Sequence, residues 1–240
     1  MSKVFGLAVM ACVVCSAAPV EASSITVYAA PFQTYQNTAN SPCVFYGPGT
    51  CPQDPSGWPA PVGDTGNSPT AFTPNPLTQT YAGAEFTQWM STIGSSFFLG
   101  LDVNQDASAQ TLSDYTIRFF NSSNTEIGNY ILTAGIQVPE GSNGVGYADF
   151  VLAAGCSGTV TGTGNTATCS QYQPFLIPVG TTSMVMTFGL TNFNDGSDKI
   201  FALAGPAVTA TPEPASLLLL GTGLVVIGRQ LRGFRRRPRG

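Results

Sequence analysis

Three side chains in a short acidic stretch have the spacing of a cation-binding loop. Asp102, Asn104 and Asp106 form the pattern D-x-N-x-D, which puts oxygen ligands at alternate positions, as calcium loops do. An EF-hand is excluded, because Ala107 replaces the glycine of its turn and Ser113 replaces its bidentate glutamate. Two readings stay open. The first is a looser Ca²⁺ site at the edge of a β-sandwich, formed by these three side chains with Asp114 as an optional fourth ligand. The second is a solvated turn in which Asp and Asn bond their own backbone.

Enzymatic activity is not expected of this chain. It contains no histidine, so the Ser-His-Asp and Cys-His arrangements of nucleophilic catalysis cannot be built. The patterns G-x-S-x-G and G-x-x-x-x-G-K-[ST] are also absent, and with them the usual nucleophile turn and phosphate loop. A glycosidase needs two facing carboxylates; Glu85, Glu126, Glu140 and Asp149 are present, but no spacing marks a pair. Apart from Ca²⁺, we expect no cofactor.

Four cysteines in the middle of the chain form two local pairs. Cys43 and Cys51 flank a stretch rich in Pro and Gly, and Cys156 and Cys169 flank a loop rich in Gly, Thr and Ser. In an oxidising compartment an even number of cysteines indicates disulfides, although three pairings are open. We favour Cys43–Cys51 and Cys156–Cys169, since each bond would close one flexible loop and contribute ~2–3 kcal/mol. A zinc site is disfavoured, because histidine and the short C-x-x-C spacing are missing.

The segments that must position these side chains alternate apolar and polar residues with a period of two. The pattern is clear over residues 97–103 and 183–190, where Met184, Met186 and Phe188 share one face. Short strands separated by turns, with no amphipathic helix before the C-terminal segment, predict an all-β fold. We expect an antiparallel β-sandwich of the jelly-roll or Ig-like kind. Further strands are expected at 25–28, 115–119, 130–133, 147–152, 175–177 and 200–203.

Two parts of this region do not follow the strand pattern. Residues 31–76 read as a loop in which a core strand is not expected, because prolines are frequent there and proline cannot donate to a sheet ladder. Residues 84–93 are ambiguous, since Phe86, Trp89 and Met90 could face inward from a helical turn.

Residues 1–22 have the features of a secretory signal peptide. Lys3 precedes an apolar run over residues 4–18, and Val20 and Ala22, on either side of Glu21, suit cleavage before Ser23. The exported domain is therefore expected to cover residues 23–210, a length that can bury a sizeable core.

The C-terminal residues 211–240 have three consecutive parts. Pro212, Glu213 and Pro214 form a stiff extended tripeptide, since proline fixes its own φ and biases the residue before it to extended geometry. The apolar run at about 215–228 would span only ~21 Å as a transmembrane helix, against a hydrocarbon core of ~30 Å. The tail 229–240 supplies arginines that snorkel and stay cytoplasmic. This membrane stop consists of Arg229, Arg232, Arg235, Arg236 and Arg237.

The order of these three parts resembles the PEP-CTERM protein-sorting signal, over about an eighth of the chain. The resemblance implies that the partner is an exosortase. Exosortases are membrane transpeptidases of Gram-negative bacteria that make extracellular polysaccharide. The resemblance also implies export by the secretion machinery, an inner-membrane intermediate held by the transient C-terminal helix, and then the outer surface or release. Residues 98–105, 146–150 and 194–196 more weakly resemble ectodomains found upstream of such signals. That likeness supports a sandwich and implies no activity.

The exported region is strongly acidic. Residues 23–211 contain eleven acidic side chains and only two basic ones, Arg118 and Lys199, so the net charge of this region is −9. Such a surface repels phosphate backbones, and nucleic acid is therefore excluded as a partner.

The expected role follows from the sorting signal and the fold class. We expect a cell-surface or extracellular-matrix protein that is structural or adhesive in a polysaccharide matrix, such as a biofilm. The alternative is a lectin-like module that binds carbohydrate through exposed aromatics such as Trp58, Trp89 or Tyr46. The competing interpretation of these three residues is that they pack in the core or in a loop. A secreted glycan hydrolase is the third reading.

Overall fold

The structure is a computed structural model of the chain. The chain divides into two units, Met1–Pro206 and Ala207–Gly240. The structure describes residues 23–31, 34–47, 51, 54–63, 75–103, 109–132, 134–139, 146–191 and 198–206. The predicted signal peptide, the tripeptide 212–214, the helix at 215–228 and the arginine tail lie outside the described residues. In the described part of the chain, no helix is long and apolar enough to cross a membrane.

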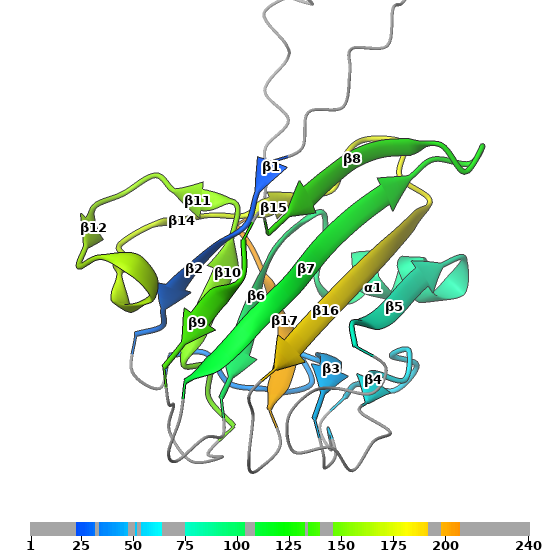
Figure 1. Cartoon of the computed structure of the whole chain (residues 1–240). Coiled ribbons are helices and arrows are strands. Elements are labelled where there is room, and N and C mark those ends of the chain that lie inside the picture. The colour runs from blue at the N-terminus through cyan, green and yellow to red at the C-terminus, as the bar shows by residue number, and fades with distance from the viewer. Residues whose placement is uncertain are drawn as a thin grey trace, which may run out of the picture. The chain divides into compact units, whose positions relative to one another are not determined.

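Two β-sheets stacked face to face form the body of the domain (Figure 1). One sheet has the order β1-β8-β7-β16-β5, with β9 added to β7. Its strands are β1 (Ser23–Ser24), β8 (Glu126–Ile131), β7 (Gln110–Phe120), β16 (Ser183–Thr191), β5 (Leu77–Ala82) and β9 (Ile136–Val138). The other sheet has the order β2-β10-β6-β17-β3-β4, with β15 added to β6. Its strands are β2 (Thr26–Ala29), β10 (Phe150–Ala153), β6 (Ser96–Asp102), β17 (Lys199–Ala204), β3 (Cys43–Tyr46), β4 (Val62–Gly63) and β15 (Phe175–Leu176).

The pairing is antiparallel except where β1 meets β8 and β3 meets β4. The longest ladder joins β16 to β7, with Met186 opposite Ile117 and Met184 opposite Phe119. These four side chains are completely buried, because alternate residues of a strand face the same side. The all-β sandwich expected from the period of two is confirmed.

The main core lies between the two sheets and is rich in aromatic side chains. Strands β6 and β17 contribute Leu99, Leu101 and Ile200 to it, and the facing sheet contributes Tyr115 and Phe188 among others. A second apolar cluster covers the other face of the sheet that contains β6, around Phe98 and Phe201.

The expectation that residues 31–76 hold no core strand is wrong. Strand β3 lies beside β17 inside the sheet, and its Val44 and Phe45 are fully buried. The prolines of this region flank the strand and do not interrupt it, so every residue of β3 keeps a backbone N–H. A four-residue strand fits between Pro42 and Pro48, although the composition of the whole stretch is that of a loop.

The ambiguous stretch at 84–93 is helix α1 (Ala84–Thr92). Phe86 and Trp89 are buried, as the helical reading expected, whereas Met90 is exposed. Trp89 packs between the rings of Tyr81 and Phe97, with centroid distances of 4.8 and 5.1 Å. The helix therefore closes one edge of the core beside β5.

The segment after β10 folds back onto the second apolar cluster. It consists of β11 (Gly155–Cys156), β12 (Val160–Thr161), the 3₁₀ turn η1 (Gly164–Thr166), β13 (Thr168–Cys169) and β14 (Tyr172–Gln173). Ala167 and Cys169 contribute buried atoms to the cluster, and the carbonyl of Ala167 accepts a hydrogen bond from the Ala29 amide at 2.8 Å. The stretch expected as a flexible loop thus shields an apolar sheet face from water.

Candidate functional site

Asp102 is the described member of the predicted cation loop, and it occupies an unusual environment. It is the last residue of β6 and is completely buried. Leu99 and Leu101 face the main core and Phe98 faces the second cluster, so alternation turns the Asp102 side chain to the side of Phe98. Both carboxylate oxygens lack a hydrogen-bond partner.

Three charged residues surround Asp102. Lys199, the first residue of β17, is its register partner, and Asp198 precedes that lysine. Asp149 accepts a hydrogen bond from the Val103 amide at 2.8 Å through its carboxylate, while its own amide donates to the carbonyl of Leu101 at 2.9 Å. Asp149, the residue before β10, is therefore bonded to both chain neighbours of Asp102.

These surroundings disfavour the charged form of Asp102. Burial contributes most, and the charge of Asp149 adds to it; Lys199 opposes the shift and Asp198 reinforces it. Together they raise the pKa of Asp102 from 3.8 to about 7. Asp198 is itself buried, and its carboxylate accepts a hydrogen bond from Gln110 Nε2 at 2.9 Å.

The loop set predicted for Ca²⁺ is only partly visible. Asn104 and Asp106 lie outside the described residues. Within the described part of the chain, no three side chains of His, Cys, Asp or Glu form a group that could hold a metal ion by themselves. The loop site therefore stays a prediction.

Both predicted disulfides are confirmed. Cys43 bonds to Cys51 with a Cα–Cα distance of 6.1 Å, and Cys156 bonds to Cys169 with a Cα–Cα distance of 5.9 Å. The first bond joins β3 to the stretch that leads to Trp58. The second joins β11 to β13 and holds the segment that covers the second apolar cluster.

Both tryptophans considered for sugar binding are buried. Trp58 is only 8 % exposed, and its Nε1 donates to the carbonyl of Cys43 at 2.8 Å. Trp89 is fully buried. The ring of Tyr46 is half-buried and lies so close to Gly63 that a Cβ atom there would overlap it. Of the two interpretations, core packing holds for both tryptophans, which fill the core beside β5.

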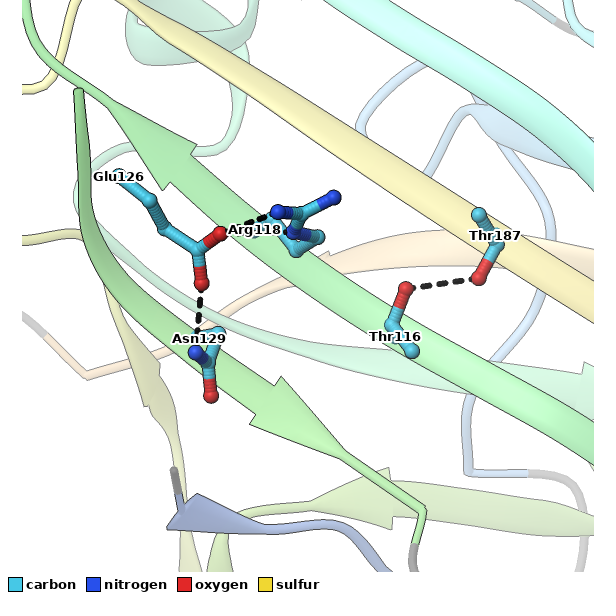
Figure 2. Close-up of polar contacts among 5 residues, drawn as sticks. All are labelled: Thr116, Arg118, Glu126, Asn129 and Thr187. Atoms are coloured by element: carbon cyan, nitrogen blue, oxygen red, sulfur yellow. Dashed lines mark hydrogen bonds and ion pairs between the residues drawn. The ribbon is translucent and has the colours of Figure 1, made fainter. Parts of the chain in front are cut away.

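The alternation predicts a polar outer face on β7 and β16, but the contacts made there with β8 were not expected from sequence (Figure 2). Arg118 Nε donates to Glu126 Oε2 at 2.8 Å, and Asn129 Nδ2 donates to Glu126 Oε1 at 2.6 Å. The hydroxyls of Thr116 and Thr187 lie 2.7 Å apart on neighbouring strands. Burial would raise the pKa of Glu126, but the hydrogen bonds from Asn129 and Arg118 and the arginine charge lower it.

The carboxylates considered for a glycosidase lie on different elements. Glu85 is in the first turn of α1, Glu126 begins β8 and Asp149 precedes β10; Glu140 lies outside the described residues. A surface cavity of about 280 Å³ beside β8 is lined by uncharged residues such as Tyr130, Asn129 and Pro178. Its lining provides no acid–base pair.

Comparison with known proteins identifies the C-terminal segment. Residues 210–237 match the family model described as PEP-CTERM protein-sorting motif. Neither the curated proteins nor the solved structures contain a significant match to this chain. The match includes the tripeptide 212–214, the apolar run and most of the arginines. The chain thus carries a PEP-CTERM sorting motif, which marks an exosortase-targeted protein of the cell surface or exterior.

Proposed function

We propose that this chain is exported, held briefly in the inner membrane by its C-terminal helix, and processed by an exosortase near Pro212–Pro214. The domain formed by residues 23–210 then remains at the outer surface or in the surrounding polysaccharide. The match of residues 210–237 to the sorting motif carries this proposal. The two disulfides support it, because such bonds persist in oxidising compartments outside the cytoplasm.

The proposed role of the domain is structural or adhesive and does not involve catalysis. The lack of histidine in the whole chain supports this role, as does the use of Glu126 in a surface ion pair. The outer face of β7, β8 and β16 carries the half-buried hydroxyls of Thr116 and Thr187 and the exposed ion pair of Arg118 with Glu126, polar groups that water can bridge to a hydrated polysaccharide.

Intact-mass analysis of the protein from its native host tests the sorting step. The host with its exosortase should yield a chain that has lost the residues after about Pro214, and a strain without the enzyme should retain them. A Pro212→Ala/Pro214→Ala variant should resemble the strain without exosortase, whereas the control Pro206→Ala, outside the motif, should be processed normally. Equal masses in both strains would refute the proposal.

Fractionation of the same cultures tests the role in the matrix. The processed domain should co-purify with the extracellular polysaccharide and be released when that polysaccharide is digested. Recovery of the domain only from the polysaccharide-free medium would contradict a matrix role while leaving the sorting step intact.

A further inference from the structure

The carboxylate of Asp102 lacks the compensation that buried charges normally have. Its side chain is fully shielded from water, and neither oxygen has a hydrogen-bond partner. Buried carboxylates in folded proteins are usually paired, protonated or bound to a metal ion. Lys199 stands opposite Asp102 in the ladder but makes no hydrogen bond to it.

Asp149 is the group placed to complete a site with Asp102. Its amide bonds the carbonyl of Leu101 and its carboxylate bonds the amide of Val103, so its backbone and side chain lie on either side of residue 102. Asp149 is half-buried, whereas Asp102 is completely buried, so Asp149 is the member of the pair that is in contact with solvent.

We propose that Asp102 and Asp149 together bind one calcium ion at the end of β6, with water and backbone carbonyls as the remaining ligands. The carboxylate of Asp198 adds negative potential nearby and stays bonded to Gln110. Ca²⁺ fits better than Mg²⁺, because it accepts irregular oxygen shells whereas Mg²⁺ requires near-ideal octahedral geometry. The proposed pair joins two strands that are distant in sequence, unlike the loop set expected from D-x-N-x-D.

An ionised Asp102 is costly without a cation, because the side chain is buried and neither oxygen has a hydrogen-bond partner. A bound divalent ion offsets this cost, since it supplies the opposite charge that the carboxylate lacks.

Calcium titration of the full-length chain in a non-ionic detergent tests the site. After chelator treatment, 10 mM Ca²⁺ should shift the unfolding equilibrium about tenfold toward the folded state, if the dissociation constant is ~1 mM as in extracellular modules. Asp102→Asn should abolish this response. The control Asp114→Asn, on β7 of the other sheet, should preserve it, and Mg²⁺ at the same concentration should have a much smaller effect.

Direct binding to the unmodified chain keeps the test independent of how the variants fold. Equilibrium dialysis with Ca²⁺ at pH 8 should give about one bound ion per chain. No bound ion at 10 mM, or a full response in Asp102→Asn, overturns the proposal. If Ca²⁺ has no effect while Asp102→Asn stabilises the chain at pH 8, Asp102 is a buried neutral acid and the proposal is likewise overturned.

Discussion

The burial of Trp58 makes its replacement a sharp test of the fold and of the lectin reading. Trp58→Ala should lower the free energy of unfolding by about 3–5 kcal/mol, as large-to-small substitutions of buried aromatics do. The side chain packs on Trp89 and Tyr81, with centroid distances of 5.5 and 5.9 Å. Trp58→Phe keeps most of this contact but removes the bond from Nε1 to the carbonyl of Cys43. It should cost about 1–2 kcal/mol.

Urea denaturation of the full-length chain, followed by far-UV circular dichroism, measures these losses. Val179→Ala is the matched control, because Val179 is fully exposed and its truncation should change stability by less than ~0.5 kcal/mol. A loss below ~1 kcal/mol for Trp58→Ala would refute the packing argument. A surface tryptophan that binds sugar would instead show unchanged stability and lost glycan binding.

Two further predictions concern the second disulfide and the surface ion pair. A Cys156→Ala/Cys169→Ala variant should lose about 3 kcal/mol of unfolding free energy through loop-closure entropy, since the bond spans 13 residues. Thermal unfolding with and without reductant checks this. Reductant should destabilise the variant less than the unmodified chain, because only Cys43–Cys51 is left to reduce. Glu126 has a lowered pKa, so its contribution to folding stability is complete above the usual pKa of a glutamate and is lost as pH falls through the lowered value. Glu126→Gln should therefore reduce the loss of unfolding free energy between neutral and acidic pH, by less than ~1 kcal/mol because the ion pair is exposed. The same loss in both proteins would show that the ion pair contributes nothing to stability.

The sequence predicts the strands well where one face is buried and the other is polar. In β16 and β7 buried residues alternate with half-buried or exposed ones up to the register shift at Gly189/Leu190, because each strand separates the main core from an outer polar face. Both disulfides are predictable for a different reason: each pair is close in sequence, so pairing requires little loop closure. The short strand β3 is missed because it has only four residues, and the frequent prolines of residues 42–76 give the whole stretch the composition of a loop.

The environment of Asp102 could not be derived from the sequence. D-x-N-x-D suggests neighbours along the chain, whereas the register brings Asp149 and Lys199 from two other strands. Register depends on which face of each strand is buried, and that depends on the whole sandwich. The position of Trp58 is unpredictable for a similar reason. Its indole lies in a proline-rich stretch without periodicity, and only the carbonyl of Cys43 and the rings around it fix its direction.

The two proposals are linked by the compartment in which the domain would work. Extracellular modules bind Ca²⁺ with dissociation constants of about 10⁻⁴–10⁻³ M, several orders of magnitude weaker than cytosolic buffers. A pair of carboxylates completed by water and carbonyls belongs to this weak class, so it would fill only outside the cell. Asp102 ends β6, which pairs with β10, β17 and β15. An ion bound there would therefore stabilise the centre of one sheet after export, and the domain would gain stability at the surface to which its C-terminal motif directs it.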